Sequence, residues 1–171
     1  MGLKQAILQI HSLLETAGID HALIGGFALA AHGINRSTGD IDLLVDEECK
    51  EIFISCLNKA GYSIEIETPE VLHFKGPVQL DVLLARRHIS KKMLARAKNT
   101  SFLNVKCLGP EDLIGLKIQA YCNDPRRELQ DKADIQYLFN KYPELDLKQI
   151  KEYADLFQQW GEIRKILGIK P

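Results

Sequence analysis

Residues 36–46 read RSTGDIDLLVD, and they predict the strand around which the rest of the fold is built. The second half is a continuous apolar run, and Asp40 and Asp42 stand one residue apart where it starts. On a strand, side chains at positions i and i+2 share a face, with Cα atoms roughly 6.5 Å apart. Like charges at that spacing repel, and a buried carboxylate without a partner is costly. The pattern therefore predicts either two solvated carboxylates or a positive group that holds them.

A third carboxylate interrupts a second apolar run. Asp81 lies within VQLDVLLA, residues 78–85. If this strand is a neighbour of the first, three carboxylates converge on one face of a sheet. Such oxygen donors suit Mg²⁺, or Mn²⁺ in its place, and two such ions about 4 Å apart clamp the attacking and leaving oxygens of a displacement at phosphorus. The alternatives are that Asp40 caps a loop and that Asp81 is salt-bridged.

A glycine pair precedes this acidic strand. Residues 23–33, LIGGFALAAHG, predict a strand, the pair Gly25 and Gly26, and a short helix. Glycine allows the backbone to approach a ligand closely, and the following helix offers free N–H groups. The pair is therefore a candidate phosphate site, although a glycine pair taken alone is more often a plain tight turn, and only its order relative to the acidic strand is informative.

Taken in order, these features resemble the nucleotidyltransferase superfamily with the DNA polymerase β-like fold. The resemblance covers roughly residues 20–85. It depends on the glycine pair, on the pattern R-x-T-x-D-x-D and on the later strand carboxylate, which are Gly25, Gly26, Arg36, Thr38, Asp40, Asp42 and Asp81. It implies an α/β (α+β) fold in which a central mixed sheet is flanked by helices.

The same resemblance implies a role for each of these residues. The glycine turn would hold the phosphates of ATP or another NTP, with Arg36 and Thr38 contributing to the nucleotide site. Asp40, Asp42 and Asp81 would be both catalytic and metal-binding, and the third would also help to activate the acceptor hydroxyl. Many members have Gly-Ser where this chain has a glycine pair, so the serine hydroxyl is absent.

The C-terminal third carries two charged residues inside apolar helical stripes. Lys117 lies in the apolar arc of one predicted helix, and Asp131 lies on the apolar side of the next. Because Lys and Asp are rarely buried unless paired, the two are expected to meet or to share a ligand. Residues 111–139 resemble the C-terminal motif of small prokaryotic nucleotidyltransferases related to the AbiEii abortive-infection toxins. That resemblance implies catalytic roles for Lys117 and Asp131, with Asp134 as the alternate, whereas the plain reading is a structural ion pair.

The pattern of elements predicts two parts. Residues 1–108 are expected to form the nucleotidyltransferase core, including a strand at 101–108. Residues 109–171 are expected to form a helical extension that completes the same domain, ending in one helix at 147–167.

Composition bounds the class of protein. The net charge is −1, and 46% of the residues are hydrophobic. The longest apolar run is too short to span a bilayer, and four cysteines without a C-x-x-C pair indicate reduced thiols. We therefore expect a cytoplasmic protein without a membrane partner. Residues 86–106 are basic, which is typical either of a segment that follows a polynucleotide or of a solvated helix face.

The sequence predicts an Mg²⁺-dependent enzyme that moves an NMP from an NTP to an acceptor hydroxyl and releases pyrophosphate. The acceptor is a tRNA, a protein or a small molecule. The alternative is a catalytically weak nucleotide-binding or interaction module, such as one component of a toxin–antitoxin pair with a cognate partner. A structural domain that binds no nucleotide is the third reading.

Overall fold

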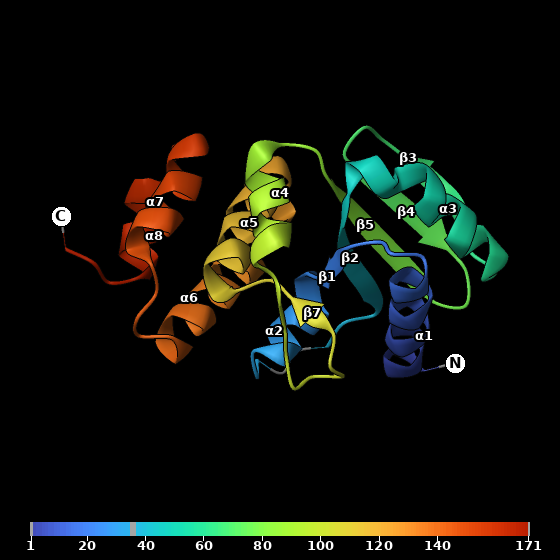
Figure 1. Cartoon of the computed structure of the whole chain (residues 1–171). Helices are drawn as coiled ribbons and strands as arrows, with labels where there is room; N and C mark the ends of the chain where they lie inside the picture. The colour runs from blue at the N-terminus through green and yellow to red at the C-terminus, as the bar shows by residue number, and fades with distance from the viewer. Residues whose placement is uncertain (1, 35–36, 171) are drawn as a thin grey trace. The chain divides into compact units, whose positions relative to one another are not determined.

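The computed structural model describes residues 2–34 and 37–170, and the chain divides into two compact units (Figure 1). The first unit comprises Met1–Leu108 and the second Gly109–Pro171. Within the described residues, none of the helices combines the length and the hydropathy needed to span a bilayer.

The first unit is built on a mixed sheet. In its described part, seven strands lie in the order β3-β4-β5-β2-β1-β7-β6. Their bounds are β1 (His21–Leu23), β2 (Asp40–Asp46), β3 (Ser63–Glu67), β4 (Val71–Lys75), β5 (Gln79–Ala85), β6 (Lys98–Asn99) and β7 (Lys106–Cys107). Strand β2 runs parallel to β5 and antiparallel to β1. The predicted mixed sheet with helices is confirmed.

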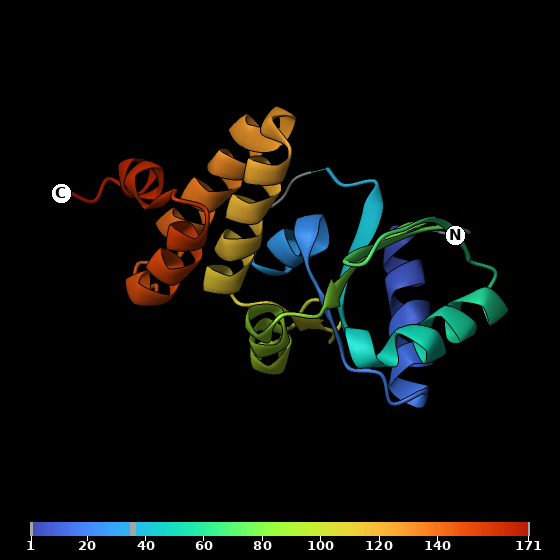
Figure 2. The ribbon, with the colours of Figure 1, turned by 90° about the horizontal axis from the view of Figure 1, so that it is seen from above.

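Helices α1 and α3 cover one face of this sheet (Figure 2). The helices of the unit are α1 (Leu3–Thr16), α2 (Gly25–Ala31), α3 (Lys50–Lys59) and α4 (His88–Arg96), with a 3-10 turn at Glu47–Cys49. The ring of Phe53 on α3 meets that of Phe74 on β4 edge-on, with centroids 5.8 Å apart. Because both rings are buried, this face of the sheet carries the core of the unit.

Strand register separates the apolar face from a polar one. Phe74 is opposite Leu80, and Leu80 is opposite Ile41, so these three share the face covered by α1 and α3. Side chains alternate along a strand, and Asp42 and Asp81, which are opposite each other, therefore lie on the other face. The alternation predicted from DIDLLVD thus places the carboxylates away from the main core.

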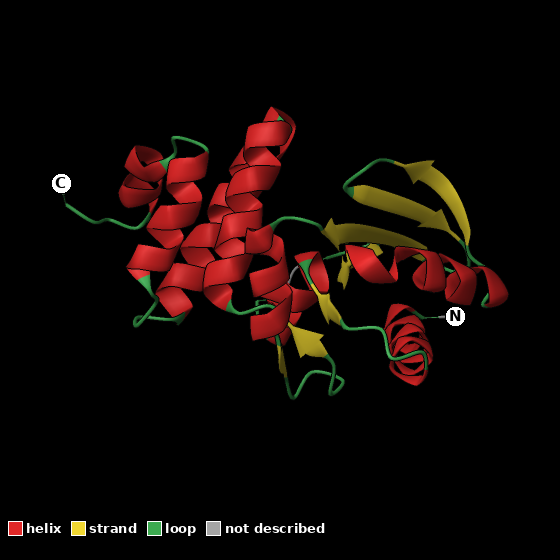
Figure 3. Cartoon of the chain, turned by 45° about the horizontal axis from the view of Figure 1, so that its top comes forward, coloured by secondary structure: helices red, strands yellow, loops and turns green. Residues whose placement is uncertain are grey.

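The second unit is helical in its described residues (Figure 3). Its helices are α5 (Pro110–Asn123), α6 (Glu128–Lys141), α7 (Leu147–Leu156) and α8 (Trp160–Ile166), with a 3-10 turn at Pro125–Arg127. The prediction of a single helix at 147–167 is wrong, because α7 ends at Leu156 and α8 begins at Trp160. Between them, Gln158 has a φ of 57°, which a continuous helix does not allow.

The strand predicted at 101–108 is also wrong over most of its length. Only Lys106–Cys107 forms β7, and residues 101–104 form a turn. Leu103 and Asn104 adopt φ values of 54° and 53°, in the left-handed region that a strand excludes. Asn tolerates this region because its short side chain hydrogen-bonds locally, and the apolar composition of the segment hid that signal.

Candidate functional site

Three carboxylates meet on the polar face of the sheet. Asp42 on β2 is opposite Asp81 on the parallel neighbour β5, and Asp40 lies two residues earlier on the same face. One oxygen from each of the three lies within 4.8 Å of the others. All three side chains are half-buried, so their repulsion is only partly screened by water. Closely spaced oxygen donors of this kind fit a hard divalent cation.

A histidine orients the third carboxylate. His73 on β4 is opposite Asp81, and its Nδ1 donates to Asp81 Oδ1 at 2.7 Å. This bond fixes one oxygen of Asp81 and leaves the other for a ligand. His73 has no role among the residues predicted from the sequence, although VLHFK places it between the buried Leu72 and Phe74 and thus on the polar face.

Replacing His73 is expected to weaken the binding of a divalent cation by the three carboxylates. His73→Phe keeps an aromatic ring and removes the donor, so Asp81 loses its orienting bond. Losses of such outer partners cost about 10–100-fold in metal affinity. The check is the Mg²⁺ concentration that half-saturates the protein in a calorimetric titration. His73→Asn, whose amide donor stands near the position of Nδ1, is the matched control, and an unchanged Mg²⁺ affinity in His73→Phe would remove His73 from the site.

The glycine pair is packed directly against the carboxylates. The backbone N–H of Ile24 donates to the carbonyl of Asp42 at 3.0 Å, which brings the next residue alongside that aspartate. Gly25 has a φ of 60°, and a Cβ there would lie 2.0 Å from Asp42 Oδ2. Only glycine fits such a close approach without displacing the carboxylate. The backbone at the pair is therefore part of the same site as the acidic cluster.

Gly26 faces a threonine from the loop before β2. A Cβ at Gly26 would lie 2.6 Å from both Cβ and Oγ1 of Thr38. The Thr38 hydroxyl donates to Asp40 Oδ1 at 2.9 Å, so it links the glycine pair to the acidic cluster. Thr38 thus fills the space that a serine side chain at position 26 would need. Arg36, which the sequence analysis also placed in the nucleotide site, lies outside the described residues.

Placing at position 26 the serine that the family resemblance implies is expected to destabilise the protein. Gly26→Ser must displace Thr38, and overpacking of this kind costs about 1–3 kcal/mol of stability. Urea unfolding measures the loss. The double variant Gly26→Ser with Thr38→Gly removes the Cβ of residue 38 together with its hydroxyl and frees the space, so it is expected to be more stable than the sum of the two single changes implies. A Gly26→Ser protein as stable as the parent would contradict the packing argument.

The second unit holds a buried ion cluster. Lys117 on α5 donates from Nζ to Asp131 Oδ1 and lies equally close to Asp134 Oδ2, each at 2.7 Å. Arg127 Nε adds a bond of 3.1 Å to Asp131 Oδ2. The Lys117 side chain is 5% exposed and that of Asp131 1%. The predicted contact between Lys117 and Asp131 is present, and Lys117 also contacts Asp134, the alternative aspartate.

Several cations of the basic segment are paired with carboxylates. Arg86 Nε lies 2.7 Å from Glu47 Oε1, and Lys91 Nζ lies 2.5 Å from Glu48 Oε1. The Arg87 side chain is 72% exposed, and its Nη2 lies 2.6 Å from Glu70 Oε1. Local pairing of this kind balances the basic charge at the surface and favours the reading as a solvated, ion-paired face.

Solved structures with the same fold are nucleotidyltransferases. That of ANT(2″)-Ia in complex with adenylyl-2″-tobramycin has a TM-score of 0.69 and 16% identity, over 91% of this chain and 96% of that chain. An antigenic nucleotidyltransferase-like protein from Paracoccidioides brasiliensis gives 0.62 and 22%, over 98% and 93%. The lincosamide antibiotic adenylyltransferase LnuA, lincomycin-bound, gives 0.60 and 17%, over 81% and 97%. At these identities the likeness shows the fold, which is polymerase β-like as predicted.

A family assignment comes from the sequence itself. A search of curated proteins finds no match. The sequence profile of the family described as nucleotidyl transferase AbiEii toxin, type IV TA system, matches residues 12–166. That span includes the glycine pair, the three carboxylates and the buried lysine cluster. The chain therefore belongs to the AbiEii nucleotidyltransferase toxin family.

Proposed function

We propose that this protein is an Mg²⁺-dependent enzyme that transfers an NMP from an NTP to an acceptor hydroxyl and releases pyrophosphate. Membership of a nucleotidyltransferase family supports NMP transfer in general. The observation that carries the metal dependence is the group of three carboxylate oxygens within 4.8 Å of one another. The close packing of Asp42 against Gly25 supports a shared site for metal and triphosphate.

Each residue of the polar face has a place in this proposal. Asp40, Asp42 and Asp81 would hold Mg²⁺, or Mn²⁺ in its place, and the ion would offset the negative charge of the triphosphate. Gly25 and Gly26 would present backbone N–H groups to the phosphates, because neither carries a side chain that blocks the approach.

The supporting residues fix the geometry of the carboxylates. Thr38 holds Asp40 by its hydroxyl, and His73 holds Asp81 by its ring. In the reaction, the acceptor oxygen forms a bond to the α-phosphorus while the bond to pyrophosphate breaks. The acceptor proton leaves toward Asp81, whose second oxygen is not held by the His73 ring. Positioning and charge neutralisation supply most of the rate in such transfers.

Three further residues enter the proposal through the family resemblance. Arg36 and Lys117 would offset charge on the triphosphate, since fixed cations stabilise the negative charge of the transition state. Asp131 would act with Lys117, to which it is hydrogen-bonded. The triple variant Lys117→Met, Asp131→Asn, Asp134→Asn separates the contribution of Lys117 and Asp131 to the reaction from their contribution to the fold.

The defining experiment measures label transfer from each of four α-³²P-labelled NTPs. The purified protein is incubated with Mg²⁺ and with total tRNA, cell-lysate protein or a small hydroxylated antibiotic as acceptor. We expect stable labelling of one acceptor class, lost on addition of EDTA and restored by Mg²⁺ or Mn²⁺. The toxin description of the family favours tRNA or protein as acceptor. The antibiotic ligands of two solved structures make tobramycin and lincomycin the small molecules to include.

A second candidate function keeps nucleotide binding and loses turnover. The replacement of the usual serine by Gly26 favours it, because that hydroxyl contact to phosphate is missing. Saturable binding of Mg²⁺–NTP without transfer of label to any acceptor would support this function, a nucleotide-binding module without turnover. If the protein shows no thermal shift with Mg²⁺–NTP and no transfer, both functions fail and a structural domain remains.

A cognate antitoxin is the partner that the family description implies. We place this pair in the cytoplasm, in keeping with four free cysteines among the described residues. Expression of this chain alone is expected to slow bacterial growth. Relief of that effect by one co-expressed protein from the same host would identify the antitoxin, whereas growth unaffected by the active enzyme would argue against a toxin.

A further inference from the structure

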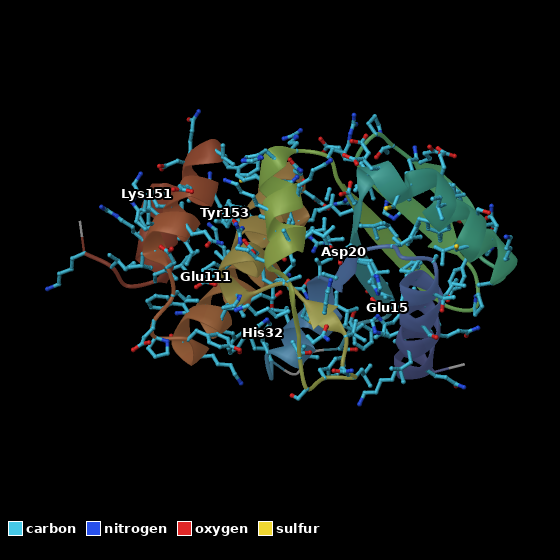
Figure 4. The ribbon with its side chains drawn as sticks, in the orientation of Figure 1. Glu15, Asp20, His32, Glu111, Lys151 and Tyr153 are labelled. Atoms are coloured by element: carbon cyan, nitrogen blue, oxygen red, sulfur yellow. The ribbon has the colours of Figure 1, made fainter. Side chains whose placement is uncertain are left out.

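Two histidines and a glutamate meet on the face of the sheet opposite the three carboxylates. His21 is the first residue of β1 and is opposite Val45, whose side chain faces away from Asp42 and Asp46 along β2. His11 and Glu15 lie one turn apart on α1, where Figure 4 labels Glu15. One ligand atom from each of the three lies within 4.8 Å of the others.

The buried histidine turns an unprotonated ring nitrogen toward the other two residues of this group. His21 is 2% exposed, and its Nδ1 lies 2.8 Å from the carbonyl oxygen of Ile19. A carbonyl only accepts, so Nδ1 carries the proton and Nε2 is the acceptor atom of the ring, which takes a hydrogen bond from the His11 Nδ1–H. Nε2 points at His11 Nδ1 at 2.8 Å. A ring nitrogen freed in this way by a backbone carbonyl on the other is the usual arrangement of a metal-binding histidine.

The surroundings keep His21 neutral, which a metal ligand must be. Burial is the main cause that lowers the pKa of His21, and the neighbouring His11 lowers it further. Glu15 is exposed and supplies a negative charge at the open side of the group. The set therefore combines two imidazoles with one carboxylate, with access from solvent.

We propose that His11, Glu15 and His21 form a second divalent-metal site, selective for Zn²⁺ over Mg²⁺. Nitrogen ligands favour zinc and its neighbours in the transition series, whereas the carboxylate cluster favours hard ions. Zn–N bonds of about 2.0–2.1 Å in a tetrahedron place the two nitrogens roughly 3.3 Å apart. Rotation of the half-buried His11 side chain supplies this widening, and water completes the fourth position.

An ion at this site would link α1, which carries His11 and Glu15, to β1, which carries His21, and its role would be to stabilise the fold. It lies on the face of the sheet away from the proposed nucleotide site and does not depend on nucleotide transfer. An ion that binds only the folded state raises its stability. At zinc in about hundredfold excess over Kd, the melting temperature is expected to rise by about 5 °C or more.

The test uses full-length protein without a polyhistidine tag, freed of metal with EDTA and exchanged into buffer. Zn²⁺ is titrated by calorimetry, and Co²⁺ is added as a spectroscopic probe of tetrahedral nitrogen–oxygen coordination. Wild type is expected to bind one zinc at this site, to show visible Co²⁺ bands, and to give neither response with Mg²⁺. Thermal unfolding with and without Zn²⁺ gives the stability readout.

Variants locate the ion. His11→Gln is expected to weaken zinc binding at least tenfold and to abolish the Co²⁺ bands and the thermal shift, and Glu15→Gln is expected to weaken binding less. Both positions are at least partly exposed, so these variants should fold. His88→Gln, which removes an exposed histidine outside the group, is the matched control. Zinc affinity unchanged in His11→Gln, or lost only in Asp42→Asn, would overturn the proposal.

Discussion

Asp42→Asn is expected to lower nucleotide transfer by about a thousandfold while the protein stays folded. Asn has the same shape but no charge, so it removes a metal ligand without creating a cavity. Asp42 stands opposite Asp81 and beside Asp40, and one oxygen of each is within 4.8 Å of the others. Because Asn keeps the volume and shape of the Asp42 side chain, the folded structure is expected to be retained.

The measurement is the initial rate of label transfer at saturating NTP, with Mg²⁺ varied, beside urea unfolding of the same preparation. Asp46→Asn is the matched control, because Asp46 lies on the same strand and outside the cluster. Its side chain caps the following turn by accepting from the Glu48 N–H, which Asn also does. Transfer by Asp42→Asn above a tenth of the wild-type rate would show that this carboxylate does not hold the catalytic metal.

The sequence predicted the sheet and its acidic face from local alternation. In β2 and β5, apolar residues interrupted by single aspartates define both the strand and the direction of each side chain. If the strands were neighbours, the carboxylates had to converge, and the structure places Asp42 opposite Asp81. The metal and nucleotide roles of these residues stay predictions.

Contacts between residues that are far apart in the chain could not be predicted from the sequence. His73 acts on Asp81 only because β4 lies antiparallel to β5, and no local pattern fixes that register. His11 and His21 have no ligand spacing along the chain, yet a helix and a strand bring them together. The space at Gly26 likewise depends on a loop threonine twelve positions later in the sequence, Thr38, whose side chain only the fold locates. Local propensity carries no information on such contacts.

Lys117→Met is expected to lower the free energy of unfolding by about 3–5 kcal/mol. Lys117 is the cation between Asp131 and Asp134, at 2.7 Å from an oxygen of each. Met fills the space of the lysine stem but removes the cation that lies between the two buried carboxylates, while Arg127 Nε still donates to Asp131 Oδ2. A loss of this size is a large part of the total of about 5–15 kcal/mol that holds most domains folded.

Urea unfolding followed by circular dichroism measures the loss. Lys132→Met on α6 is the matched control, because Lys132 pairs with Glu128 at 2.6 Å nearer the surface. Such pairs contribute up to about 1 kcal/mol, so the control is expected to change little. A Lys117→Met protein as stable as the control would mean that the aspartates are not held by Lys117 in solution.

A neutral version of the cluster separates stability from turnover. The triple variant Lys117→Met, Asp131→Asn, Asp134→Asn carries no buried unpaired charge, so it is expected to recover much of the stability lost in Lys117→Met. The family resemblance implies that Lys117 and Asp131 also serve the reaction. On that reading the triple variant is folded, yet its label transfer falls at least about tenfold below wild type. A triple variant that is folded and transfers label at the wild-type rate would refute the catalytic role, because the ion cluster would then act on the fold alone.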